Sequence, residues 1–529
     1  MLKLSLYCIG LSMSLAGFSS QAGAQTDTPA ALPNNESASA VKGADPTPGI
    51  ADAPAIGAAT VAKEAPVAPV APAVASAPPQ EMPAPVAKQT VGLAPLDNLP
   101  APVKGKWSPI LYGFLAFDMV HDSTQSFSTG SPGYLLIAKK GTFAGDHGRT
   151  VFDARGSRFG FRLAAPEMDG MKATAVIEAD FVGNQLPMNY GANPTGISEN
   201  STYNNGLMRI RHAAIKIESR YVDVLAGQYW QLFGWAPMYL PVTTQIPGYP
   251  GVPYGRNTQL RVSHTFKTDP ISIELAVAAV RPAQRNAEYP DAHGGARLMV
   301  NHWRGVSAVG ATGAAFLEMP AGIAVSGIFR RLKVAEFAAA PSKQNGVTGG
   351  GVSVDAFLPV IPSNLKSKAN ALNITGNFTA GRAIGDMYAP GTIGGAGFPA
   401  LANPNAVTPA PTWAQDIDNG LVTYEQATGN IHAIKWVTGF AGIQYYLPPS
   451  GRVWLAANYG YAKSSNIASY DLAKDKIVTK YTMWDGVAYV NIVGPVTFAA
   501  EFAREEQTDG NGKTAKNDRV MGSFYYQFW

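Results

Sequence analysis

The chain ends in Arg519-Val-Met-Gly-Ser-Phe-Tyr-Tyr-Gln-Phe-Trp529, a stretch that reads as a β-strand finishing on aromatic residues. The period of two places Val520, Phe524, Tyr526 and Phe528 on one face. In a soluble protein such a strand would expose unpaired backbone groups and an apolar edge. In a transmembrane β-barrel the last strand pairs with the first, and aromatic residues lie at the lipid interface. We therefore expect this strand to pair with residues 107–120 and to close a barrel.

The N-terminus predicts export. Met1-Leu-Lys3 is a short basic start, residues 4–18 are mostly apolar, and Ala22-Gly-Ala24 is a small-residue cleavage site. This pattern is typical of a secretory signal peptide, which we place at residues 1–24. The single cysteine, Cys8, lies inside it, so we expect a mature chain without disulfides, cysteine metal sites or cysteine nucleophiles.

Residues 25–106 differ in composition from the rest of the chain. Proline, alanine and valine dominate, as in Ala65-Pro-Val-Ala-Pro-Val-Ala-Pro72, and residues 25–106 contain no aromatic residue. Such a segment cannot bury a core, so we expect a disordered, polyproline-like linker in the periplasm. A passive tether is the simpler interpretation, and contact with the cell wall or another periplasmic partner is the alternative.

Short alternating segments fill residues 107–529. In Ile271-Ser-Ile-Glu-Leu-Ala-Val277, for example, Ile271, Ile273, Leu275 and Val277 share one face. The fold class that we expect is all-β: a transmembrane antiparallel β-barrel of about sixteen strands, an even number as bacterial barrels require. The predicted strands are 107–120, 154–164, 172–183, 208–218, 222–234, 258–267, 271–281, 294–303, 321–334, 347–358, 371–383, 431–446, 452–463, 478–491, 495–506 and 518–529.

The connections between these segments alternate in length. Short turns are predicted at 166–170, 219–221, 268–270, 448–451 and 493–494, and long loops at 121–153, 184–207, 235–257, 282–293 and 384–430. Barrels show this asymmetry, with short periplasmic turns and longer extracellular loops. Residues 304–320 fit poorly, because they are too long for a periplasmic turn. Residues 208–218 switch their apolar face near Ala213, which predicts a β-bulge.

Several classes of function find no support in the sequence. The formal net charge of +4 and the 15% of charged residues show no basic clustering of the kind that binds nucleic acid. Neither a G-x-S-x-G nor an H-E-x-x-H motif occurs, and the histidines have no metal-binding spacing. We therefore expect no catalytic residues, no metal and no cofactor.

Charged residues recur on the predicted inner face of neighbouring strands. Arg158 and Arg162 share a face, as do Arg209 and Arg211, and Arg261 lies inward on a later strand. Glu178 and Asp180 also face inward. Rows of opposite charge that face each other would create a transverse field that filters solutes by charge. The alternative is that these side chains pair with each other and only solvate the wall.

Residues 234–256 form a candidate constriction loop. The segment is rich in proline and in aromatic residues, which would stiffen it and let it pack on itself. Folded into the lumen, it would set the bore, with Trp235, Tyr239, Tyr249 and Tyr254 as the candidate residues. The alternative is an external loop packed at a subunit contact.

The early strands resemble those of DcaP-like outer-membrane porins. The resemblance covers roughly residues 150–265, through Arg155-Gly-Ser-Arg-Phe-Gly-Phe-Arg-Leu163, Lys172–Gly183, Arg209-Ile-Arg-His-Ala213, Val224–Trp230 and Arg256-Asn-Thr-Gln-Leu-Arg261. It implies a sixteen-stranded trimeric channel in the outer-membrane lipid, with a basic constriction for small anionic solutes such as dicarboxylates. On this basis Arg158, Arg162, Arg209, Arg211 and Arg261 are candidate pore-lining residues. Our full set of pore-lining candidates also includes Arg155, Glu178, Asp180 and Arg256.

Two departures from that family stand out. A Pro/Ala-rich tract stands where the family has a coiled-coil segment, and Gln527 occupies a position near the C-terminus that is usually apolar. The function that we expect is passive diffusion through a porin. The alternative is a structural, adhesin or receptor barrel that is tethered to the envelope through residues 25–106. An outer-membrane enzyme comes third and would need a serine, histidine and acid on neighbouring strands.

Overall fold

The computed structural model describes residues 105–126, 136–183, 206–236, 238–244, 249–282, 287, 289–309, 315–335, 342–388, 420–425, 430–470 and 474–528. The predicted signal peptide, nearly all of the predicted linker, and most of the predicted loops 184–207 and 384–430 lie outside these residues. Among the described residues, no helix is long and apolar enough to cross a membrane.

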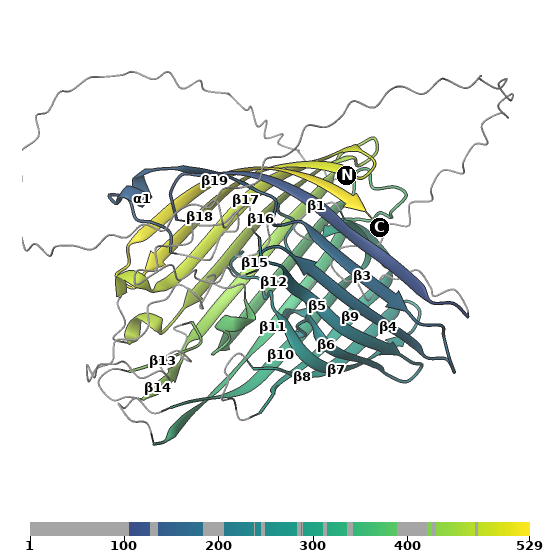
Figure 1. The fold of residues 1–529 in the computed structure, drawn as a ribbon, viewed down its shortest axis with the longest axis horizontal. Helices are drawn as coiled ribbons and strands as arrows, with labels where there is room; N and C mark the ends of the chain where they lie inside the picture. Colours follow the sequence, from purple (N-terminus) through teal and green to yellow (C-terminus); the bar gives the residue numbers. More distant parts are fainter. Residues whose placement is uncertain are drawn as a thin grey trace, which may run out of the picture. The chain divides into compact units, whose positions relative to one another are not determined.

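The described chain forms a closed antiparallel β-barrel (Figure 1). Its first eight wall strands are β1 (Ser108–Asp122), β2 (Arg149–Asp153), β3 (Arg158–Ala164), β4 (Lys172–Asp180), β5 (Arg209–Glu218), β6 (Asp223–Trp230), β7 (Arg256–Lys267) and β8 (Ile271–Val280). The wall continues with β9 (Asp291–Val309), β10 (Ala315–Ala335), β11 (Gln344–Ile361), β12 (Leu372–Arg382), β15 (Lys435–Tyr446), β16 (Val453–Ser464), β17 (Val478–Val493), β18 (Val496–Asp509) and β19 (Thr514–Phe528).

The wall has sixteen positions, as predicted, because β2 and β3 occupy one position between them. Residues 118–122 of β1 pair with β2, and residues 108–114 of β1 pair with β3. Residues 154–157 interrupt the pairing, and Ser157 accepts a hydrogen bond from the backbone N of Ala116 at 3.0 Å. The predicted strand 154–164 therefore missed the first part of this wall position, because residues 149–153 also belong to the wall.

The first and last strands close the barrel, as the C-terminal pattern predicted. β1 pairs with β19 in a continuous register from Gly113↔Phe528 to Asp122↔Arg519. Figure 1 shows the two strands side by side. Val520, Phe524 and Tyr526 are exposed on the outer face. Each described wall strand pairs on both sides except the short β2, for which only the pairing with β1 is seen, so the wall has no full-length edge strand.

The predicted short turns are found between β3 and β4, β5 and β6, β7 and β8, β15 and β16, and β17 and β18, all at one end of the barrel, which we call the turn end. The opposite end is the loop end, where a further short turn, residues 510–513 between β18 and β19, lies. One predicted strand began too early, because residues 431–433 form β14 (Ile431–Ala433), which pairs with β13 (Val422–Tyr424) outside the wall. The remaining described elements are short: α1 (Phe143–Asp146), η1 (Phe233–Trp235), η2 (Gly385–Met387), η4 (Ile467–Ser469) and η5 (Lys474–Lys476).

The two faces of the wall have opposite character. On β8 the residues Ile271, Ile273, Leu275 and Val277 are exposed, whereas Ser272 and Ala276 are buried. Polar and charged side chains are buried on the inner faces of other strands, for example Arg162 on β3 and Glu505 on β18. An apolar outer face and a polar inner face are the reverse of a soluble protein and typical of a barrel in lipid.

Candidate functional site

Residues 231–255 connect β6 to β7, and we call their described part, residues 231–236, 238–244 and 249–255, the inner loop; it lies inside the barrel. Gly234 donates its backbone N–H to Ser326 of β10 at 2.8 Å, and Trp235 donates its indole N–H to the carbonyl of Val325 at 3.1 Å. Farther along, Asn458 of β16 donates to the carbonyl of Val242 at 2.9 Å. The inner loop therefore contacts β10, three strands along the wall from β7, and β16 on the opposite side of the ring.

The middle of the inner loop, at Thr243 and Thr244, is held by one carboxylate. Glu501 of β18 accepts hydrogen bonds from the Thr243 hydroxyl at 2.7 and 2.8 Å. It also accepts from the backbone N and the hydroxyl of Thr244, both at 2.6 Å. Tyr525 of β19 donates to the carbonyl of Thr244 at 3.1 Å. Charge-assisted hydrogen bonds of this kind are among the strongest in proteins, so Glu501 fixes this part of the loop.

The four aromatic residues singled out in the inner loop are all buried. Trp235, Tyr239 and Tyr249 belong to one hydrophobic cluster with Tyr254 and the inner-face residue Phe440. The wall makes room for them with glycine: a Cβ on Gly460 would lie 2.3 Å from the carbonyl oxygen of Pro250 and 2.5 Å from the Tyr249 ring. These contacts place the loop in the lumen, and its role as the constriction stays a prediction.

Five arginines converge at the base of the inner loop, and we call them the arginine cluster: Arg158 and Arg162 from β3, Arg209 and Arg211 from β5, and Arg256 from β7. The predicted bulge is confirmed in β5, because the pairing with β4 shifts register between Glu178 and Ala179 and leaves Arg211 as the extra residue. The bulge lets Arg209 and Arg211 both reach the same acidic side chain.

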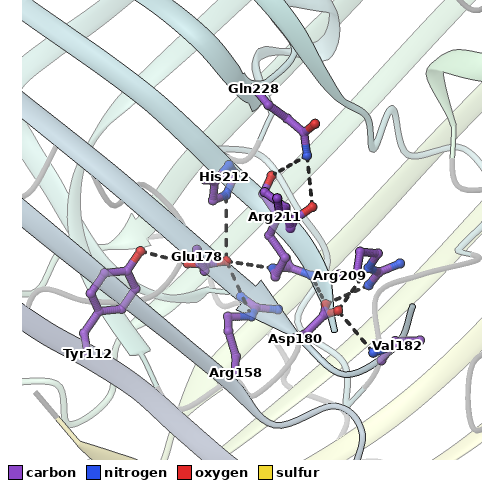
Figure 2. Close-up of polar contacts among 10 residues, drawn as sticks. Tyr112, Arg158, Glu178, Asp180, Val182, Arg209, Arg211, His212 and Gln228 are labelled. Atoms are coloured by element: carbon purple, nitrogen blue, oxygen red, sulfur yellow. Dashed lines mark hydrogen bonds and ion pairs between the residues drawn. The ribbon is translucent and has the colours of Figure 1, made fainter. Parts of the chain in front are cut away.

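Two carboxylates of β4 lie within the cluster (Figure 2). Glu178 accepts from Arg211 Nε at 2.7 Å and from the Tyr112 hydroxyl at 3.0 Å, and Arg158 Nε lies 3.6 Å away. Asp180 accepts from Arg209 Nη2 at 2.7 Å and from Arg211 Nη1 at 2.8 Å. The acidic and basic residues therefore sit on adjacent strands of one wall. The expectation of rows of opposite charge facing each other was wrong for these residues.

Aromatic side chains cover the cluster. Arg256 lies over the rings of Trp230 and Tyr254, at 5.4 and 5.7 Å from their centroids. Arg158 and Arg162 lie over Phe114 and Tyr112, at 5.1 and 5.7 Å. Arg158, Arg162 and Arg211 are almost fully buried, while Arg209 and Arg256 are partly exposed. Cation–π contacts and burial hold these side chains in fixed positions.

The cluster has more positive than negative charge. The cluster contains five guanidinium groups and two carboxylates, which is an excess of three positive charges within the cluster. Nη2 of Arg211 and Nη1 of Arg256 are buried and have no hydrogen-bond partner among those residues. Two donors of this kind can bind an anion that reaches them.

The other two candidates lie outside the cluster. Arg155 sits in the break between β2 and β3 and folds back on Asp153, with Nε to Oδ1 at 3.0 Å and Nη2 to Oδ2 at 2.9 Å. Arg261 of β7 donates to Gln259 at 2.9 Å and to the carbonyl of Trp230. Arg261 is partly exposed on the inner face, so it remains a candidate for contact with solutes.

An acidic sector of the inner wall was not predicted. Asp122, Asp485, Glu501 and Glu505 are buried on the inner faces of β1, β17 and β18, and Arg519 pairs with Asp122 at 2.7 Å. The inward parity of Asp485 and Glu501 could have been read from the sequence, because their neighbours Trp484 and Phe502 are apolar and outward, whereas Asp122 and Glu505 lie between polar residues. Among the described residues, no three His, Cys, Asp or Glu side chains are placed to hold a metal ion.

No family model matches the chain, and no curated protein matches it in sequence. Among solved structures it is similar to the outer membrane channel DcaP of Acinetobacter baumannii, with a TM-score of 0.54, 18% identity, and coverage of 80% of this chain and 99% of that one. It also matches an anion-selective porin from Comamonas acidovorans (TM-score 0.43, 9% identity, 80% and 100% covered) and Pseudomonas putida OprB (0.42, 10%, 80% and 94%). The expected likeness to DcaP is confirmed for the architecture: the chain has the fold of that outer membrane channel.

Proposed function

We propose that this protein is an outer-membrane porin of the DcaP-like family, a passive channel for small hydrophilic solutes that prefers anions such as dicarboxylates. The observation that carries the proposal is the arginine cluster inside a closed barrel, with its excess of positive charge beside the inner loop. A closed barrel with an apolar outer face belongs in lipid, and its polar interior offers a path for water-soluble molecules.

The preference for anions follows from the charges of the cluster. Positive side chains fixed in a narrow, water-poor site lower the energy of an entering anion and raise that of a cation. A dicarboxylate has two groups that accept hydrogen bonds from guanidinium, and the free donors of Arg211 and Arg256 are of the right type. The partly exposed Arg209 and Arg261 would meet the solute first.

The proposal also covers the N-terminal segments, the orientation of the barrel in the membrane and its oligomeric state. Residues 1–24 direct export, residues 25–106 are a periplasmic linker, and the turn end faces the periplasm. The assembly is a homotrimer. β4, β5 and β6 have only 9, 10 and 8 residues, against 21 in β10. A barrel strand needs about 9–11 residues to span the membrane, a length that β4 and β5 only just reach and β6 does not, so we assign this shortest part of the wall to the contact with a neighbouring subunit.

Reconstitution of the purified protein into liposomes tests the proposal. Liposomes that contain the protein should swell in isotonic solutions of small sugars and of dicarboxylate salts, and they should swell faster with dicarboxylates than with cationic amines of equal size. Protein-free liposomes are the control. Folded protein that gives no swelling above this control would contradict the proposal.

A further inference from the structure

Between Val300 and Ala321, the described residues 301–309 and 315–320 depart from the barrel wall and lie on its inner side. β8 pairs with β9 only as far as Ile271↔Val300, and β10 pairs with β11 only from Gly322↔Phe357. The pairing of β9 with β10 shifts between Ala321 and Pro320, which leaves residues 301–303 unpaired on β9. Residues 304–309 and 315–320 then pair with each other away from the wall. We call these two segments the inner hairpin.

The inner hairpin lies against the inner faces of four wall strands. Trp303, just before it, donates its indole N–H to the carbonyl of Pro359 on β11 at 2.8 Å. Asn373 of β12 donates to the carbonyl of Val306. The backbone N of Ala308 donates to Gln444 Oε1 at 3.0 Å and to the Tyr446 hydroxyl at 2.6 Å, both on β15.

Apolar and cationic contacts complete this anchorage. The centroids of the Phe316 ring and the Trp454 ring on β16 lie 5.0 Å apart. Nζ of Lys368, in the turn between β11 and β12, lies 3.6 Å from the centroid of the Phe316 ring. Val306 and Ala308 are completely buried. A Cβ on Gly305 would lie 2.4 Å from the side chain of Pro359, so only glycine allows this close approach.

The hairpin also supports the inner loop. Leu317 and Met319 belong to the hydrophobic cluster that contains Tyr239 and Leu240, and Phe316 belongs to the cluster that contains Val242. The inner hairpin thus lies between the wall at the turn end and the inner loop. Its most exposed described side chains are those of Arg304 and Glu318, which form an ion pair at 2.9 Å and are 39% and 31% exposed.

We propose that the inner hairpin forms a second constriction of the lumen, at the turn end and in series with the inner loop. This rests on the proposed channel function. A solute that has passed the inner loop must still pass the Arg304–Glu318 ion pair before it leaves the barrel. Resistances in series add, so the hairpin limits conductance even where the inner loop leaves the path open.

A direct turn in place of the hairpin tests this. Val300 and Ala321 are already paired, so replacing residues 301–320 with Asn-Gly joins them through a two-residue β-turn. If the two constrictions have similar resistance, the single-channel conductance should rise about twofold. An unchanged conductance in a variant that folds would overturn the proposal.

A milder variant covers the case in which this replacement does not fold. The mature chain is expected to lack cysteine, so Arg304→Cys can be labelled alone with a bulky anionic thiosulfonate. Labelling should lower the conductance by about half or more. The matched control is Phe329→Cys on the outer face of β10, which is 63% exposed and should show no change. An unaltered Arg304→Cys conductance after complete labelling would refute the second constriction, whereas wild-type protein without channels would refute both proposals.

Discussion

Replacing Glu178 with glutamine should destabilise the barrel strongly, because one buried carboxylate balances several buried cations. Glu178 is 1% exposed, pairs with Arg211 at 2.7 Å and lies 3.6 Å from Arg158. Removing one partner of a buried ion pair costs about 3–5 kcal/mol, since the remaining charge stays buried without compensation. Arg211 keeps its contact with Asp180 at 2.8 Å, so we expect a loss near the lower limit, about 3 kcal/mol.

The assay is unfolding of the folded protein by guanidinium in detergent micelles, followed by tryptophan fluorescence and extrapolated to zero denaturant. Asp518→Asn is the matched control, because Asp518 pairs with Arg504 at 2.6 Å but both side chains are 38% exposed. Exposed pairs contribute about 0–1 kcal/mol, so the control should unfold almost as the wild type does. If Glu178→Gln and Asp518→Asn lower the free energy of unfolding by the same small amount, the cluster is not a buried ionic network.

Three further predictions concern the loop, the turn end and the linker. Glu501→Gln weakens the hydrogen bonds to Thr243 and Thr244, so single-channel recordings should show a noisier open state than those of the wild type, and equal noise would argue against this anchor. Burial lowers the pKa of Lys368 to about 8, so its positive charge is present below that pH and is lost as the pH rises from 7 to 9. Anion preference should therefore decrease over this range in the wild type but not in Lys368→Met, and a parallel decrease in both would exclude Lys368 as the cause. Deleting residues 25–106 should leave conductance unchanged, and a lost conductance would give the linker a part in the pore.

The sequence predicted the wall well because lipid imposes a simple rule on it. Outward apolar residues alternate with inward residues along β8 and β19. The first and last strands pair, as the C-terminal pattern predicted. The bulge in β5 was also predicted, since the switch of apolar face near Ala213 has no other simple cause. These features depend on local parity, which a single sequence contains.

Features inside the lumen could be predicted only in part, because they depend on contacts between distant segments. The inward arginines were identified by parity, but parity does not show that Trp230 and Tyr254 cover Arg256 or that Glu178 joins Tyr112 to Arg211. Residues 304–320 were recognised as too long for a turn. Their inward fold depends on Asn373 and Tyr446, which lie far away in the sequence.

The most direct test of the central claim is the zero-current potential of single channels in a planar bilayer with a gradient of potassium chloride. We expect channels whose zero-current potential has the sign of chloride preference, and a shift of that potential toward potassium preference when Arg209 and Arg261 are both replaced with glutamine. Channels that prefer potassium in the wild type, or a potential that is the same in the double variant, would contradict the claim that these arginines select the solute.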